Sequence, residues 1–455
     1  MPVLTIDVPA LGNRCHLVHD GRVAIVVDAP RDLTAVEAAA EAAELEIVAV
    51  ADTHIHNDYV SGALGLARRH GADYLLSADE SVDFERVGVH DRDRLSYGSI
   101  DLEVLSTPGH TRHHQSFLAR IGAEAPALLS GGSLLVDTVG RTDLVDHRLA
   151  GMLAGSQWES ARRLGALSPS TVLLPTHGFG SFCSSASVDP DAADGVATIG
   201  AQLLRNPALL QDKETFVNDL LAGLGPIPSY YQHMDPLNRA GRGAVTPPPA
   251  RPVTADEVSD AILGGAWVID LRSRDDFAAG HVAGTVSVEY SHQFATYVGW
   301  LVPWGDDIVL LTDSADVLDP ALRQLADIGI DRVDAHVVDA DAPLTARYRR
   351  ADWAAFRDAA RIGSATGRPP VVIDVRQLDE WRAGHLAGAL HIPIQDVEAS
   401  VRRLPPGELW VHCRSGYRAG IAASLLHRAG RDVVHLDDAW DRVGDLRIET
   451  FSTAA

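Results

Sequence analysis

VIDVRQLDEWRAGHLAGALHI (372–392) parallels the earlier stretch VIDLRSRDDFAAGHVAGTVSV (268–288). Each copy reads as a short apolar strand, an Asp-x-Arg step, a polar helix start and a Gly-His turn. His281 and His385 lie 104 positions apart, which is typical of a duplicated domain rather than a solenoid repeat. A second apolar strand and a helical stretch follow in each copy, and such alternation indicates parallel α/β units. The second half therefore predicts two α/β domains with parallel sheets.

The stretch HCRSGYRAGIAASLLHRAG (412–430) follows the strand ELWV and continues as an amphipathic helix pattern. Cys413 therefore falls at a strand-to-helix turn, where backbone N–H groups and a helix N-terminus face its sulfur. Such a turn binds anions, so it stabilises a thiolate or a persulfide, and Arg418 adds a positive charge. We expect Cys413 and Arg418 to be catalytic. The polar loop residues expected to bind the substrate are Arg414, Ser415, Gly416 and Tyr417.

Histidines occur directly after apolar strands in three loops of the first half. They are His54 and His56, with Asp58, in ADTHIHNDYVSG (51–62), His110 in STPGHTRHH (106–114) and His177 in LLPTHGFGS (173–181). A single histidine of this kind would be a surface residue at a loop tip. Histidines from three strand-end loops together indicate a metal site assembled at one edge of a sheet.

These motifs resemble two families. The Asp-x-Arg repeat and the Cys413 loop look like tandem rhodanese domains, which are persulfide-forming sulfurtransferases. Thr-His-x-His-x-Asp resembles the signature of the metallo-β-lactamase fold, and STPGHT, GRTDL and PTHG point to its persulfide dioxygenase branch. The domain order is similar to that of fusions between a persulfide dioxygenase, an inactive rhodanese and an active one.

The resemblance implies an α/β protein of three domains. Residues 1–240 would form a metallo-β-lactamase-like αββα sandwich, and residues 254–348 and 349–455 two rhodanese-like α/β domains with parallel sheets. The first rhodanese-like copy has Thr312 and Asp313 near the place of the cysteine. Since neither side chain can hold a sulfane sulfur, this copy is expected to be inactive.

Two positions depart from the family's metal site. Tyr59 replaces the last histidine of the signature, so a two-metal hydrolase site is not expected. Gly132, in LLSGGSLL, replaces an aspartate that binds iron in the dioxygenase branch together with the positions matching His54 and His110.

Three alternatives follow from Gly132. His56 completes a three-histidine iron site, or a carboxylate comes from elsewhere, with Asp137 the nearest downstream acid, or metal binding is lost. The expected ligands of one Fe²⁺ per chain are His54, His56 and His110, with Asp58 and His177 as hydrogen-bonding groups around them.

The resemblance implies an enzyme of sulfur metabolism. Cys413 would take a sulfane sulfur from thiosulfate or a thiol persulfide, and the iron site would oxidise a low-molecular-weight thiol persulfide to sulfite. Sulfite accepts sulfur from a rhodanese, which gives thiosulfate.

The alternatives are an active rhodanese beside a metal-free lactamase-like domain, and a sulfur carrier that transfers its persulfide sulfur to a partner. A zinc hydrolase of the glyoxalase II kind conflicts with Tyr59 and Gly132. Related dioxygenases are often dimers or tetramers, so a homo-oligomer is compatible with the resemblance.

The composition and charge of the chain limit the partners and the cellular location that we expect. The chain has 455 residues, 46% of them hydrophobic, and a formal net charge of −23. This charge repels nucleic acids and anionic membrane surfaces. Three cysteines are too few for a disulfide framework, and neither a signal peptide nor a membrane span is recognisable. We expect a cytoplasmic protein whose proline-rich segment GRGAVTPPPARPVT (241–254) separates the two halves.

Overall fold

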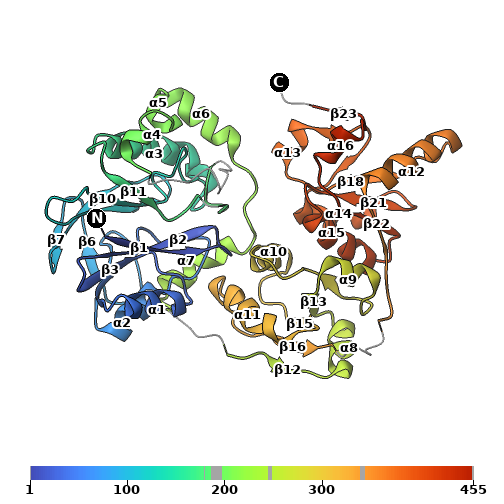
Figure 1. The fold of residues 1–455 in the computed structure, drawn as a ribbon, viewed down its shortest axis with the longest axis horizontal. Helices are drawn as coiled ribbons and strands as arrows, with labels where there is room; N and C mark the ends of the chain where they lie inside the picture. Colours follow the sequence, from blue (N-terminus) through green and yellow to red (C-terminus); the bar gives the residue numbers. More distant parts are fainter. Residues whose placement is uncertain (1, 179, 186–196, 244–247, 339–343, 453–455) are drawn as a thin grey trace. The chain divides into compact units, whose positions relative to one another are not determined.

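The computed structural model describes residues 2–178, 180–185, 197–243, 248–338 and 344–452 (Figure 1). Its contacts divide the chain into two compact units. The first unit contains Met1–Pro247 and Arg323–Asp331, and the second contains Pro248–Leu322 and Arg332–Ala455. Within the expected proline-rich linker, residues 244–247 lie outside the described residues.

Among the described residues, no helix is both long and apolar enough to cross a bilayer.

Two mixed sheets form the centre of the first unit. The first sheet has six strands in sequence order, antiparallel from β1 to β3 and parallel from β3 to β6. These strands are β1 (Val3–Val8), β2 (Asn13–His19), β3 (Val23–Val27), β4 (Glu46–Ala51), β5 (Asp73–Ser77) and β6 (Val87–Val89). The second sheet has the order β11-β10-β9-β8-β7. Its strands are β7 (Arg94–Tyr97), β8 (Ile100–Ser106), β9 (Gln115–Arg120), β10 (Ala127–Gly131) and β11 (Val172–Pro175).

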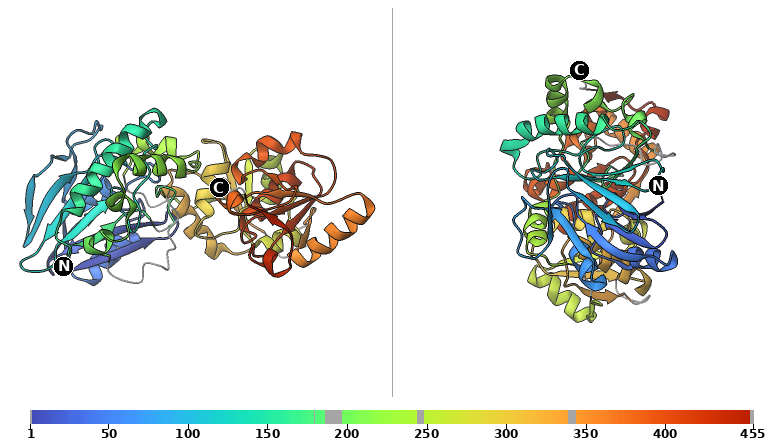
Figure 2. Two further views of the ribbon diagram at one scale, coloured as in Figure 1. Left: turned by 90° about the horizontal axis from the view of Figure 1, so that it is seen from above. Right: turned by 90° about the vertical axis from the view of Figure 1, so that its left-hand side faces the viewer.

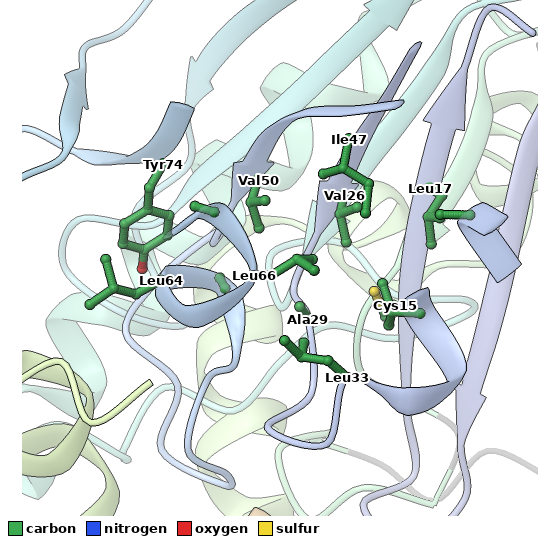
Figure 3. Close-up of a cluster of buried hydrophobic side chains, with 14 of the residues drawn as sticks. Cys15, Leu17, Val26, Ala29, Leu33, Ile47, Val50, Leu64, Leu66 and Tyr74 are labelled. Carbon is green, nitrogen blue, oxygen red and sulfur yellow. The ribbon is translucent and has the colours of Figure 1, made fainter. Parts of the chain in front are cut away.

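The two sheets pack face to face, because one hydrophobic cluster joins Ile25 and Leu75 of the first sheet to Val104 and Phe117 of the second. On the outer face of the first sheet, α1 (Thr34–Ala42) and α2 (Ala63–His70) cover a second cluster (Figure 3). Helices also cover the outer face of the second sheet. They include α3 (Ala150–Gly165), α4 (Ile199–Gln202), α5 (Pro207–Leu210) and α6 (Lys213–Gly223), and α7 (Tyr231–Arg239) follows in the chain. Figure 2 shows these layers from two further directions. The unit is the expected αββα sandwich.

The second unit contains two five-stranded parallel sheets with one strand order. In both sheets the first strand lies beside the fifth, followed by the fourth, second and third. The first sheet comprises β12 (Arg251–Pro252), β13 (Trp267–Asp270), β14 (Val286–Ser287), β15 (Ile308–Thr312) and β16 (Asp334–Val337). The second comprises β17 (Arg349–Ala351), β18 (Val371–Asp374), β20 (Leu390–His391), β21 (Leu409–His412) and β22 (Val433–Leu436). The two sheets thus share one strand order, as a duplicated domain would.

Helices connect the strands in both copies. In the first copy they are α8 (Ala255–Gly264), α9 (Arg274–Ala279), α10 (Phe294–Leu301) and α11 (Leu318–Asp327). In the second they are α12 (Trp353–Thr366), α13 (Leu378–Ala383), α14 (Val397–Ser400), α15 (Tyr417–Arg428) and α16 (Arg442–Asp445). A small antiparallel pair joins β19 (His385–Leu386) to β23 (Thr450–Phe451).

The Asp-x-Arg step has one structural role in both copies. Arg376 donates to the buried carboxylate of Asp374 at 2.6 Å and to the carbonyl of Gly384 at 2.7 Å. Arg272 makes the same pair of bonds in the first copy, to Asp270 at 2.7 Å and to a glycine carbonyl at 3.0 Å. The repeated residues therefore tie the end of the second strand to the Gly-His turn.

The end of α11 belongs to the first unit. Arg31 donates to the carbonyl of Ala326 at 2.6 Å and forms a bidentate pair with Asp331. The backbone N–H of Val60 donates to the carbonyl of Asp327 at 2.8 Å. Val60 follows the first histidine loop, so this segment supports that loop from outside the histidine cluster.

Candidate functional site

Five buried imidazoles pack together in the first unit. The loop after β4 supplies His54 and His56, the segment between β8 and β9 supplies His110 and His114, and the end of β11 supplies His177. The ring centroids of His54 lie between 4.2 and 5.4 Å from those of the other four. The structure thus brings together all the histidines that the sequence predicted.

The cluster contains a group suited to a metal ion. One ligand atom from each of His54, His110 and His177 lies within 4.8 Å of the others. The Nε2 atoms of His54 and His177 are 3.5 Å apart, and Nε2 of buried His110 has no hydrogen-bond partner among the described residues. Burial lowers the pKa of His54 well below its usual value and that of His110 to about 3. Neutral imidazoles offer lone pairs, so these residues fit a metal ion.

His56, a predicted ligand, lies in a different group. The structure groups it with Asp58 and His177, and separately with Asp28 and Asp52. Its Nε2 lies 3.2 Å from Asp28 Oδ1 and 3.0 Å from the hydroxyl of Tyr59. Although burial opposes protonation, the carboxylates of Asp28 and Asp52 raise the pKa of His56 to about 10.

The other predicted participants have partners of their own. Asp58 accepts a hydrogen bond from Asn13 at 2.7 Å, and its second oxygen has no partner in the described part of the chain. Asp137 accepts from Gln202 and pairs with Arg205 at 3.2 Å, outside the candidate metal groups of the described residues.

A cavity of about 280 Å³ lies beside the cluster. Asn57, between His56 and Asp58, and Thr111, next to His110, belong to its lining. The remaining lining residues are Ile55, Asp79, Glu80, Ser81, Arg112, His113, Val145, Asp235 and Arg239. Its size is near the lower end of small-molecule pockets.

In the second unit, Cys413 lies at the predicted strand-to-helix turn. It follows β21, its side chain is 1% exposed, and the backbone N–H of Gly416 donates to Sγ at 3.2 Å. Gly416 has φ +91° and is the N-cap residue directly before α15, and its carbonyl accepts a hydrogen bond from His435 at 2.9 Å. Arg414 and Ser415 are exposed beside this turn. The loop therefore presents a hydrogen-bond donor and a helix N-terminus to the sulfur.

Arg418 is fixed by an acid that the sequence reasoning missed. Its guanidinium pairs with both carboxylate oxygens of Glu380, at 2.6 and 2.8 Å. Although burial opposes ionisation, these bonds lower the pKa of Glu380. Arg418 is thus held rigidly beside the loop with much of its charge compensated by Glu380.

The cysteine-less copy also reaches this loop. The hydroxyl of Tyr417 donates to the carbonyl of Glu289 at 2.8 Å and accepts from Ser291 at 2.9 Å. Burial raises the pKa of Tyr297 to about 12, with smaller effects from Arg418, which lowers it, and Cys413, which raises it. The first copy therefore supports the cysteine loop of the second.

Three buried residues in the first unit were not singled out from the sequence. Nε2 of His114 accepts a hydrogen bond from the N–H of Gly132 at 3.1 Å, Asp28 contacts His56, and Asn13 contacts His177. Asp28 directly follows β3, which pairs with β4, the strand that leads to His54, so its position was a usable signal. The other two carried none that a single sequence would reveal.

Comparison with known proteins agrees with the division of the chain into two units. Residues 359–445 match the rhodanese-like domain family. A crystal structure of a metallo-β-lactamase from Staphylococcus aureus superposes with a TM-score of 0.66 at 26% identity, covering 74% of this chain and 98% of that one. The hydroxyacylglutathione hydrolase of Cereibacter sphaeroides is 32% identical over 186 residues, 39% of this chain and 67% of the relative. The chain belongs to the metallo-β-lactamase-fold family.

This metallo-β-lactamase-fold protein also contains a rhodanese domain. A second hydroxyacylglutathione hydrolase, from Cupriavidus taiwanensis, is 31% identical over 174 residues, and the chain spans 62% of its length. The S. aureus match covers more residues than the first unit contains, so that likeness extends into the second unit.

Proposed function

We propose that this chain is a sulfur-metabolism enzyme with two active sites. Cys413 transfers sulfane sulfur as a persulfide, and the histidine cluster serves the oxidation of a low-molecular-weight thiol persulfide to sulfite. Residues 254–348 form an inactive rhodanese-like copy. The observation that carries the proposal is the Cys413 loop, where a buried sulfur receives a backbone N–H at a helix N-terminus.

For sulfur transfer, the Cys413 thiolate attacks the outer sulfur of thiosulfate. The S–S bond of thiosulfate breaks, sulfite leaves with its electron pair, and Cys413 keeps the sulfur as a persulfide anion. The Gly416 N–H and the α15 N-terminus stabilise that anion, and Arg418, positioned by Glu380, lies beside the loop. Attack by an acceptor such as sulfite or cyanide on the outer sulfur regenerates the thiolate.

For persulfide oxidation, the supporting observation is the buried group of His54, His110 and His177, in which one ligand atom of each residue lies within 4.8 Å of the others. An iron ion held there supplies the activation of dioxygen. The overall reaction takes RSSH, O₂ and H₂O to RSH, SO₃²⁻ and two protons. A hydrolase with two metals is disfavoured because Gly132 has no carboxylate to bridge them and Tyr59 replaces a histidine.

Two assays test the proposal on the full chain. With thiosulfate and cyanide, the wild type should form thiocyanate, and Cys413→Ser should lose this activity while keeping the wild-type melting curve. With glutathione persulfide, the iron-loaded wild type should consume O₂ and release sulfite. Thiocyanate formation without O₂ consumption would leave a sulfurtransferase with an inactive lactamase-like unit. Persistence of thiocyanate formation in Cys413→Ser would refute the sulfur-transfer site.

A further inference from the structure

The three imidazoles whose Nε2 atoms converge all have Nδ1 engaged by a fixed partner. Nδ1 of His110 donates to the carbonyl of Arg141 at 2.7 Å, and Nδ1 of His177 lies 2.8 Å from Oδ1 of Asn13. Carbonyl and amide oxygens only accept, so in both rings the proton is on Nδ1.

The same holds for His54 through a relay. Its Nδ1 lies 2.9 Å from Oγ1 of Thr53, and that hydroxyl gives its own proton to Asp28 at 2.8 Å. The hydroxyl oxygen can therefore only accept from His54, which leaves the lone pair on Nε2. Each of the three rings thus presents a lone pair to one point, the arrangement by which outer partners orient metal-binding histidines.

Position 132 shows why a carboxylate is absent. A Cβ atom at Gly132 would collide with Cδ2 of His110 and would lie 2.6 Å from Nε2 of that ring. On its other side, a Cβ at Gly140 would lie 2.6 Å from Nδ1 of the same ring. The imidazole of His110 therefore packs directly against Gly132 and Gly140, and it occupies the space that a side chain at position 132 would fill.

Nε2 of His56 is already engaged, because it contacts Oδ1 of Asp28 and the hydroxyl of Tyr59. Its Nδ1 and one oxygen of Asp58 lack partners among the described residues, and these two residues group with His177. His177 thus belongs to the group with His54 and His110 and also to the group with His56 and Asp58, whereas His56 is absent from the group with His54 and His110.

We infer that the metal ion of this unit is bound by Nε2 of His54, His110 and His177, with His177 taking the place of the carboxylate that Gly132 cannot supply. This rests on the proposal that the unit binds a metal, but not on persulfide oxidation. Three neutral ligands leave a divalent ion its full charge. The site therefore selects an anionic partner, such as a thiolate or persulfide, over a neutral one.

The test is titration of the metal-free full chain with Co²⁺, followed by visible absorption and by metal analysis of the purified complex. His177→Gln and His56→Gln form a matched pair, since the glutamine amide at 56 can still donate to Asp28. We expect one Co²⁺ per wild-type chain. His177→Gln should lose at least about tenfold in Co²⁺ affinity, because removing even a residue that only hydrogen-bonds to a metal ligand can cost that much. His56→Gln should bind within a few-fold of the wild type.

Gly132→Asp supplies a second criterion. Because its Cβ collides with His110, this variant should bind Co²⁺ no better than the wild type and should not rescue His177→Gln. Loss of binding in His56→Gln but not in His177→Gln would overturn the inference, as would rescue of His177→Gln by Gly132→Asp or a wild type that binds no metal. Metal binding that depends on His177, without O₂ uptake, would instead overturn only the proposed oxidation. The melting curve of each variant shows that the first unit is folded.

Discussion

Asp28 shows how one carboxylate can organise two histidine loops. It accepts hydrogen bonds from the N–H of Thr53 at 2.7 Å and from its hydroxyl, contacts His56, and also accepts from the hydroxyl of Thr176. Although burial opposes ionisation, His56 and these donors hold the pKa of Asp28 well below its usual range. The orientation of both histidines on the first loop, and of the residue before His177, therefore depends on a single side chain.

Asp327 gives the first unit a pH-dependent stability. Burial, with the charge of Asp32 added, raises its pKa to about 7, against an opposing hydrogen bond from the N–H of Asp32 and the charge of Arg31. The unfolded value is about 3.9, so the folded state binds the proton more tightly. This contribution to stability is complete below about pH 4 and is lost as the pH rises through 7.

Asp327→Asn keeps the acceptor and removes the titration. We expect the variant to be more stable than the wild type at pH 8, by up to a few kcal/mol, and the two proteins to converge near pH 4. Thermal melts between pH 4 and 8 measure this difference. Parallel pH profiles would show that the carboxyl group does not titrate in this window.

Strand register explains which copy of the duplicated element carries chemistry. Asp270 pairs with Leu311 in the first copy as Asp374 pairs with His412 in the second, so Thr312 stands at the place of Cys413. The hydroxyl of Thr312 donates to the carbonyl of Ser314 at 3.0 Å, which closes a turn rather than a sulfur loop. The sequence repeat was sufficient to predict this alignment because both copies share the strand that ends in Asp-x-Arg.

Gly416 is the residue on which the cysteine loop depends. At φ +91°, a Cβ atom there would collide with Oδ1 of Asp437, whose carboxylate is held by Arg274 at 2.9 Å. Gly416→Ala should reduce thiocyanate formation at least about tenfold, because displacements of about 1 Å in an active site can cost 100-fold.

Gly430→Ala is the matched control. Gly430 has φ +76°, and no described atom beyond its neighbours lies within 4 Å of its Cβ position. That variant should lose about 1 kcal/mol of stability from backbone strain and keep its activity. Equal activities of the two variants would contradict the role given to Gly416.

Across the whole molecule, the sequence predicted the architecture better than the details of either site. Strand-end histidines and the Cys413 loop were recognisable because each lies within one short motif. The partners of these motifs come from far along the chain. Asn13 lies 164 positions from His177, and Glu289 lies 128 positions from Tyr417. The choice between His56 and His177 depends on which nitrogen carries a proton, and that follows only from those distant contacts.

The two proposed reactions predict a sequence of products. Given O₂ and a thiol persulfide as the only sulfur compound, the iron-loaded wild type should release thiosulfate, because Cys413 passes sulfur from a second persulfide to the sulfite formed in the first unit. Cys413→Ser should accumulate sulfite instead, and the metal-free wild type should form neither. Ion chromatography of the products distinguishes the three proteins. Thiosulfate formation by Cys413→Ser would mean that sulfur transfer does not pass through this cysteine.

The depth of the histidine cluster also has a kinetic consequence. The side chains of His54, His110 and His177 are at most 1% exposed, so an ion can enter or leave only when the surrounding loops open. Nitrogen ligands bind Zn²⁺ more tightly than Fe²⁺ at equilibrium, but a metal ion bound at this depth would exchange slowly. The ion carried by the purified protein would then reflect the metals available while the chain folded, rather than the equilibrium order of affinities.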